Sequence, residues 1–275
     1  MRFVNEIWMK GLYMDKHTYL MMVSKWTDRK HRKRMILGVA LFLAAISFLI
    51  LYQGVIGGKN HIVSWYEADI DQDGQKELLV IRGGEKGKVL ETGELYGDFL
   101  EVYEEYDIRG QMPSFEGKAT YQFDFSSVKP SKVMAGDIDG DGIQEIGICV
   151  YKTTKFHPVL AKRPFFYRLT DGQLEPVWLG SRLARPFLDY IVWDVDQDGM
   201  EEIVSIEKTK YGDSLVAMYD WKGFGFELKA ISKELTGETV FYKQKDTEIE
   251  QIQICNQKIC YQVRLSGSTV ELIGS

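Results

Sequence analysis

The sequence predicts an all-β fold, a small β-propeller of four blades with four antiparallel strands each, behind a single N-terminal transmembrane helix. Two observations support this fold class. One acidic nine-residue loop occurs three times, starting at positions 69, 137 and 194. Short runs rich in β-branched and aromatic residues surround each copy and are separated by Gly and Asp turns. Repeats at such intervals are typical of stacked supersecondary units.

A basic leader and an apolar segment precede the repeats. Residues 1–34 hold nine Lys or Arg and three Asp or Glu, and residues 35–52 carry no charge. About 20 apolar residues cross a hydrocarbon core of about 30 Å, and cationic flanks stay on the cytoplasmic side. We therefore expect a cytoplasmic leader over 1–34, a transmembrane signal anchor over 35–57 and an extracytoplasmic domain over 59–275. This arrangement describes a single-pass protein of the cell membrane.

A cleaved signal peptide is the alternative interpretation of this segment. Its apolar region would be about 7–15 residues long and would end at a small-x-small cleavage site. The apolar segment here is longer and lacks such a site. The composition therefore favours the uncleaved anchor.

The domain after the anchor divides into four predicted repeats, at about 60–128, 130–187, 188–237 and 238–275. In each of the first three, one strand-like run enters the acidic loop, another leaves it, and two more follow. The predicted strands cover 62–66, 78–81, 99–103, 121–125, 132–135, 146–150, 165–169, 177–179, 190–193, 203–206, 215–219, 226–228, 259–263 and 270–273. Four strands per repeat without a convincing helix favour propeller blades. Closing the ring would remove open sheet edges, whereas an open arc would need blades from another chain.

The acidic loop has carboxylates at positions 1, 3, 5 and 9 and glycine at position 6 in all three copies. Like charges this close repel one another unless a cation lies between them. A hard divalent ion with about six to eight oxygen ligands fits, and calcium fits better than the stricter magnesium. The twelve candidate ligands are Asp69, Asp71, Asp73, Glu77, Asp137, Asp139, Asp141, Glu145, Asp194, Asp196, Asp198 and Glu202.

An EF-hand is the main rival for this motif, and the sequence excludes it. An EF-hand needs a bidentate Glu at position 12 and helices on both sides. Position 12 is Val80, Ile148 or Ser205 here, and the flanks read as strands.

With these loops and strands, the chain resembles the FG-GAP/VCBS repeat family, the calcium-loop blades of integrin α-subunit propellers and of many bacterial surface proteins. The family motif Asp-x-Asp-x-Asp-Gly-x-x-Asp/Glu, followed by an aliphatic strand, is matched at every ligand position in the three loops. The resemblance implies three calcium sites, each with a backbone carbonyl at position 7 as a further ligand, here Gln75, Ile143 and Met200. A degenerate fourth loop at 242–250 keeps only Asp246 and Glu250, so we expect it to hold no ion.

The charge of the domain comes from these loops. Residues 35–275 hold 25 Lys or Arg and 37 Asp or Glu, a net charge of −12 that equals the twelve loop carboxylates. The remaining surface is therefore neutral on balance. Nucleic acid is an unsuitable partner for such a domain because its phosphates need a basic footprint.

Residues 155–188 form a separate region rich in arginine and aromatic residues. Arginine binds carboxylate or phosphate in a bidentate fashion, and flat aromatic rings stack on sugars or apolar partners. The candidate ligand-binding residues are Arg163, Arg168, Trp178, Arg182 and Arg185. These side chains would recognise a surface protein or glycan, and the arginines would suit an anionic one. Salt bridges between blades and a core position for Trp178 are the alternative.

Cysteine and histidine usage adds two expectations. Cys255 and Cys260 bracket an apparent hairpin and could form a disulfide in an exported domain, whereas Cys149 lies in an apolar run and suits a core position. Beyond the anchor, His61 and His157 have no nucleophile or zinc-ligand spacing near them. We therefore expect a non-enzymatic binding module for a cell-surface protein or glycan. A polysaccharide lyase or hydrolase and a scaffold subunit of a membrane complex are the alternatives.

Overall fold

The computed structural model describes residues 61–83, 88–109, 112–115, 117–243 and 252–274. These residues form twenty strands and one short 3₁₀ helix, Ser126–Val128, so the predicted all-β class is confirmed. No helix in these ranges is long and apolar enough to cross a bilayer. The predicted leader and signal anchor lie outside the described residues.

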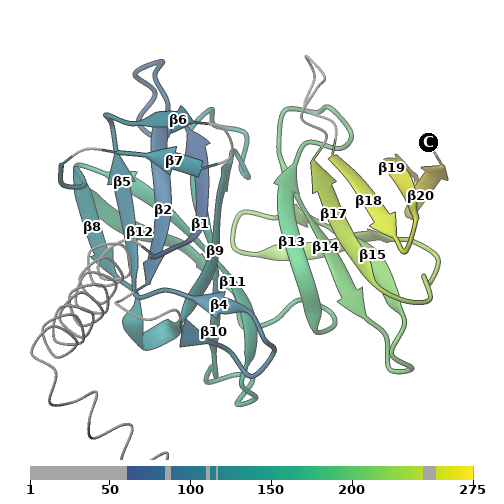
Figure 1. The fold of residues 1–275 in the computed structure, drawn as a ribbon. Helices are drawn as coiled ribbons and strands as arrows, with labels where there is room; N and C mark the ends of the chain where they lie inside the picture. The colour runs from purple at the N-terminus through teal and green to yellow at the C-terminus, as the bar shows by residue number, and fades with distance from the viewer. Residues whose placement is uncertain (1–60, 84–87, 110–111, 116, 244–251, 275) are drawn as a thin grey trace, which may run out of the picture. The chain divides into compact units, whose positions relative to one another are not determined.

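Four antiparallel meanders of four strands follow one another along the chain (Figure 1). Unit 1 consists of β1 (His61–Ala68), β2 (Glu77–Gly83), β5 (Phe99–Tyr103) and β8 (Tyr121–Asp124). Unit 2 consists of β9 (Pro130–Gly136), β10 (Glu145–Lys152), β11 (Ala161–Thr170) and β12 (Gln173–Leu179). Unit 3 consists of β13 (Phe187–Trp193), β14 (Glu202–Lys208), β15 (Ser214–Trp221) and β16 (Phe226–Ile231). Unit 4 consists of β17 (Thr239–Lys243), β18 (Ile252–Asn256), β19 (Ile259–Ser266) and β20 (Thr269–Gly274).

Units 1 and 2 are separate four-stranded sheets, whereas units 3 and 4 share one eight-stranded sheet. The joint is a parallel pairing of β16 with β20 at the single register position Ile231↔Thr269. Unit 1 also carries two short hairpins, β3 (Lys88–Val89) with β4 (Leu95–Tyr96) and β6 (Asp107–Arg109) with β7 (Met112–Ser114). These insertions account for the longer interval between the first and second acidic loops.

Every predicted strand run lies in one of these strands, apart from Phe125, which follows the end of β8. The first two strands of unit 4 and the two hairpins of unit 1 were not predicted. The predicted repeat boundaries fall close to the boundaries of the four units.

Each unit has two distinct ends. The connection from the first to the second strand contains residues 69–76, 137–144, 194–201 or 244–251, and we call this the loop end. The connection from the second to the third strand lies at the opposite end, which we call the hairpin end. The fourth of these connections, residues 244–251, lies outside the described residues.

Three buried apolar clusters join each unit to the next. Side chains alternate between the two faces of a strand, so neighbouring residues of one strand enter different clusters. Leu79 and Ile81 of β2 pack with Ile146 and Ile148 of β10, between units 1 and 2. The following clusters, between units 2 and 3 and between units 3 and 4, include Cys149 with Ile203, and Val204 with Ile254. The units therefore stack face to face through continuous apolar layers.

The face of unit 1 that points away from unit 2 is covered differently. Leu78 and Val80 are buried there together with Tyr103, and the side chains packed on them also come from unit 1. The ring of Phe115, which follows β7, stacks on Tyr103 with centroids 4.0 Å apart. Residues after β5 thus cover Leu78 and Val80. The sequence pattern predicts that these two side chains are buried but not which residues cover them.

Candidate metal centre

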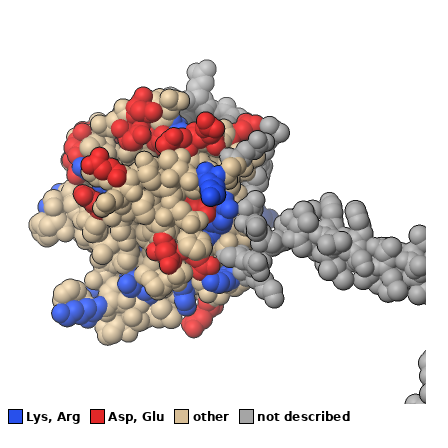
Figure 2. Space-filling model, turned by 90° about the vertical axis from the view of Figure 1, so that its left-hand side faces the viewer, with Lys and Arg blue, Asp and Glu red and all other residues tan. Residues whose placement is uncertain are grey.

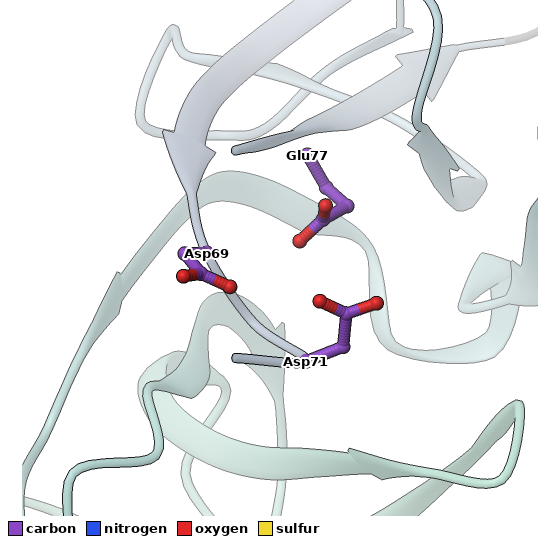
Figure 3. Close-up of side chains that lie close together, drawn as sticks. All are labelled: Asp69, Asp71 and Glu77. Atoms are coloured by element: carbon purple, nitrogen blue, oxygen red, sulfur yellow. The ribbon is translucent and has the colours of Figure 1, made fainter. Parts of the chain in front are cut away.

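The acidic loops bring three carboxylates together in each of the first three units. The ligand atoms of Asp69, Asp71 and Glu77 lie within 4.8 Å of one another. Figure 3 shows these three carboxylates facing a common point inside the first loop. The same positions gather in the second and third loops, as Asp137, Asp139 and Glu145 and as Asp194, Asp196 and Glu202. Positions 1, 3 and 9 of the motif therefore form the core of each candidate site.

The three loops share a glycine with a positive φ angle at position 6. Gly74, Gly142 and Gly199 have φ angles of +85°, +86° and +94°, a region that costs other residues free energy. Each glycine donates its N–H to the aspartate at position 1, with N···O distances of 3.1, 2.8 and 3.1 Å. This hydrogen bond fixes the orientation of the first carboxylate.

The glutamate at position 9 opens the second strand of each unit and is buried in all three. Its carboxylate accepts a hydrogen bond from the backbone N–H at position 2, at 3.0 Å for Glu77 and Ile70. Burial raises the pKa of Glu77, the Ile70 amide opposes this shift, and the neighbouring loop carboxylates add to it. A buried carboxylate among like charges needs a compensating cation.

One atom of the first loop lacks any such compensation. Asp69 Oδ1 is buried and accepts no hydrogen bond from the described residues. No Lys or Arg of the described part forms an ion pair with Asp69, Asp71 or Glu77. An orphaned buried carboxylate oxygen that faces two more carboxylates fits a hard cation that prefers oxygen ligands.

In the second loop, the equivalent oxygen has a partner, because Asp137 Oδ1 accepts the backbone N–H of Gly140 at 2.7 Å. A protein cation lies beside the other three carboxylates of this loop, which Arg168 of β11 reaches from across the sheet. Its Nε lies 2.8 Å from Glu145 Oε1, its Nη1 lies 2.8 Å from Asp141 Oδ2, and its Nη2 lies 3.3 Å from Asp139 Oδ2. Burial disfavours the charge of Arg168, but these carboxylates outweigh it and raise the pKa of the guanidinium.

The third loop has a lysine instead. Lys229 Nζ, from β16, lies 2.7 Å from Asp196 Oδ2, 3.1 Å from Glu202 Oε1 and 2.9 Å from Asp220 Oδ1. Sequence reasoning missed Lys229 altogether, because it stands 27 residues after the loop. The signal for it is the strand order, which places β16 beside β15 and β15 beside β14.

The aspartates at position 5 lie outside the three triads. These residues, Asp73, Asp141 and Asp198, are exposed. Their Oδ1 atoms accept the backbone N–H of position 7, from Gln75, Ile143 and Met200, at 2.7, 2.9 and 2.9 Å. The degenerate fourth loop falls largely on residues 244–251, outside the described residues.

The predicted arginine-rich patch does not form one surface. Arg163 is only 1 % exposed, and its guanidinium donates to the backbone carbonyls of Val159 and Ser181, so it supports the fold rather than a ligand. Arg168 belongs to the second acidic loop. Trp178 packs on Phe226 with ring centroids 5.1 Å apart, as the alternative interpretation expected.

The two remaining patch residues lie at the hairpin end. Arg182 is exposed, whereas Arg185 pairs with the buried carboxylate of Glu207 at 3.3 Å. The five side chains are therefore divided between two ends of the molecule and its interior.

The cysteines take the positions that the sequence suggested. Cys255 and Cys260 are paired directly across β18 and β19 and form a disulfide, with Cα atoms 4.0 Å apart. Cys149 is a free, buried thiol. Burial raises its pKa to about 11, so it is not a reactive thiolate at neutral pH.

In comparisons with known proteins, no protein-family model and no curated protein matches this chain. The resemblance to FG-GAP/VCBS repeats therefore stays a prediction from the loop motif. The structure supplies acidic triads that could hold a metal ion and an all-β frame of repeated meanders around them.

Proposed function

We propose that this chain is a membrane-anchored, extracytoplasmic calcium-binding module with propeller-type blades, which recognises a glycan or protein at the cell surface and performs no chemistry. Calcium ions bound by the triads of positions 1, 3 and 9 would hold the loop end of each blade in shape. The anchor is the predicted segment 35–57, and the export direction follows from the basic leader.

The observation that carries the proposal is the first acidic loop. It holds three facing carboxylates, and among the described residues one of their oxygens is buried without a partner and no Lys or Arg forms an ion pair with them. A divalent ion would satisfy Asp69 Oδ1 and relieve the repulsion that raises the pKa of Glu77. Calcium tolerates the irregular oxygen set of such a loop better than magnesium, which demands a near-octahedral set.

A cavity beside the second loop supports the recognition part of the proposal. It has a volume of about 660 Å³ and lies between the second and third acidic loops. Asp139 and Arg168 supply polar groups, whereas Trp221 and Met200 supply apolar surface. A tryptophan face beside carboxylates and a guanidinium suits a sugar ring, which offers both apolar C–H groups and hydroxyls.

Calcium titration of the full chain in lipid nanodiscs tests the metal part. We expect saturable heat of binding with dissociation constants of about 10⁻⁴–10⁻³ M, the range of extracellular calcium modules. Thermal unfolding should shift upward in calcium and return on chelation with EGTA. If calcium produces neither binding heat nor a shift in the unfolding temperature, the metal proposal is wrong.

Retention on soluble polysaccharides tests the recognition part. The full chain in nanodiscs is passed through gels that contain xylan, β-glucan or polygalacturonate, and retardation is measured with calcium present. Trp221→Ala should abolish any retardation, while Tyr211→Ala, an exposed aromatic at the other end, should leave it unchanged. Release of shorter sugars from any of these polymers would support the enzyme alternative instead.

A further inference from the structure

The hairpin end presents the same pair of residues in all four units. The connection from the second to the third strand contains a lysine followed at once by an apolar or aromatic residue. These pairs are Lys88-Val89, Lys155-Phe156, Lys210-Tyr211 and Lys258-Ile259. Their second members are 57 %, 85 %, 77 % and 56 % exposed.

Contacts between the units place these tips at one common end of the domain. Lys162 of unit 2 lies 2.6 Å from Glu94, in the hairpin connection of unit 1. Ser214 Oγ, at the start of β15, lies 3.1 Å from Thr239 Oγ1, at the start of β17. At the loop end, Glu201 donates its backbone N–H to the Asp137 carbonyl at 2.8 Å. Corresponding ends of successive units therefore lie side by side.

The two ends carry opposite charge. The loop end holds the carboxylates of the three acidic loops, whereas the β10–β11 tip, residues 152–163, contains four Lys or Arg and no Asp or Glu. In Figure 2, Asp and Glu crowd the upper edge of the face in view, and most Lys and Arg lie below them. A second cavity, of about 580 Å³, opens at the hairpin end and is lined by Arg185, Lys208 and Lys210, with Glu234 among its acidic neighbours.

Most of the tip lysines are available to a partner. Lys88 is paired with Asp98 at 2.7 Å, but Lys155, Lys210 and Lys258 form no ion pair with any described residue. Lys210 Nζ lies 4.7 Å from the ring centroid of Tyr211, so cation and ring form one exposed amphipathic unit. The β10–β11 tip adds Val159 and Leu160, which are also exposed.

We propose that the hairpin end docks on the surface of an anionic lipid bilayer. The apolar side chains at the tips enter the interface between headgroups and acyl chains, and the lysines bind lipid phosphates. Exposed apolar side chains on separate tips, each beside a lysine, suit a fluid headgroup layer, because lipids can rearrange around each side chain. A protein interface instead has a fully buried centre that is enriched in aromatic residues, whereas these apolar side chains lie on separate tips.

The position at which the chain enters the domain supports the same orientation. β1 begins at His61, which pairs with Gly83 at the hairpin end. The predicted anchor ends at residue 57, only a few residues before β1 in the sequence. This part of the inference rests on the proposed membrane anchor, whereas the charge and exposure of the tips do not depend on it.

Hydrogen exchange of the full chain in nanodiscs tests the docking. Nanodiscs of pure phosphatidylcholine are compared with discs that contain one quarter phosphatidylglycerol. We expect amides of residues 153–160 and 209–213 to exchange at least about fivefold more slowly on the anionic discs, since each lysine near an anionic surface contributes about that factor. Added salt at about 0.5 M should remove the protection, and amides of the acidic loops should not change.

Two matched variants make the test specific. Phe156→Ser should lower the protection of the β10–β11 tip, while Phe224→Ser should not, although Phe224 is equally exposed, at 87 %, in the β15–β16 turn at the loop end. Equal exchange on both kinds of disc, or equal effects of the two variants, would overturn the docking proposal. Loss of the chain from discs in alkaline carbonate would instead contradict the anchor, so the two failures can be told apart.

Discussion

The first and second acidic loops have the same backbone but differ in what neutralises their carboxylates. In unit 2, Tyr167 of the third strand pairs with Ile146, and the next residue, Arg168, fills the loop. In unit 1, Tyr103 pairs with Leu78 in the same way, and the next residue is Glu104. One equivalent position thus carries a cation in unit 2 and an anion in unit 1.

The third loop lies between these two cases. Tyr219 pairs with Ile203, and the next residue is Asp220, an anion like the one in unit 1. Lys229 of the fourth strand compensates by binding Asp196, Glu202 and Asp220. Loops with the same motif therefore differ in how far protein cations neutralise their carboxylates, least in the first loop and most in the second. This ranking follows from the neighbouring strands rather than from the loops themselves.

The largest effect is expected when the protein cation is removed from the second loop. Arg168→Ala leaves the fully buried Glu145 without its partner and should lower the free energy of unfolding in EGTA by about 2–3 kcal/mol. Millimolar calcium should restore part of this loss, because the ion can now bind without displacing a guanidinium. Chemical unfolding in EGTA and in calcium measures both quantities. A variant as stable as the parent in EGTA would show that Arg168 does not neutralise the loop.

A smaller effect is expected from the first loop. Asp69→Asn removes the carboxylate whose Oδ1 has no partner, so the stabilisation by calcium should fall by about 1–2 kcal/mol, the value for one site at roughly ten times its dissociation constant. The highest-affinity site should disappear from a calorimetric calcium titration. The matched change Asp137→Asn in the second loop should alter the titration less, because Arg168 already competes there. Equal losses in the two variants would contradict the ranking of the loops.

Introducing an arginine beside the first loop tests whether the position of the cation determines the difference between the two loops. Glu104→Arg places in unit 1 the cation that unit 2 has at the same register position. We expect the free energy of unfolding in EGTA to rise by about 0.5–1 kcal/mol, and the calcium affinity of the first loop to fall. Glu105→Arg makes the same change in net charge one residue later and serves as the control. An equal response to both variants would mean that net charge, and not the position of the cation, determines the result.

The strands and the acidic triads could be predicted from the sequence because both depend on local patterns. Alternating apolar runs define strands, and Asp, Gly and Glu at fixed spacing define the loop. The glycine at position 6 is needed locally, since its φ angle is positive in all three copies. The same local information predicted positions 1, 3, 5 and 9 as ligands, and the structure gathers positions 1, 3 and 9 in each loop.

Long-range features were missed for a physical reason. Leu78 and Val80 read as buried, but the pattern does not say that residues after β5, Phe115 among them, cover them. Arg163 has the residue type of a surface cation, yet its buried guanidinium donates to the backbone carbonyls of Val159 and Ser181, and the second of these lies 18 residues away. The role of Arg168 likewise depends on the β10–β11 register, which no local pattern determines.

The smallest expected effect concerns the contact between the second and third loops. Glu201 lies there with Oε2 buried and without a hydrogen-bond partner. Burial, followed by the charges of Asp137, Asp194 and Glu202, raises its pKa from 4.5 to about 7. Between these two pH values the folded chain binds a proton that the unfolded chain does not, so stability in EGTA should fall as the pH rises from about 4.5 to 7.

Glu201→Gln should remove this pH dependence, because the amide cannot ionise. We expect the variant to be more stable than the parent at pH 8 by about 1 kcal/mol or less, since the side chain is partly solvated, and unchanged at pH 5. Calcium should reduce the difference at pH 8, because an ion in either neighbouring loop lowers the cost of a charged Glu201. Unfolding curves at the two pH values, with and without calcium, measure all three effects. A gain in stability that is the same at pH 5 and pH 8 would mean that Glu201 acts through packing against Gly136 rather than through its charge.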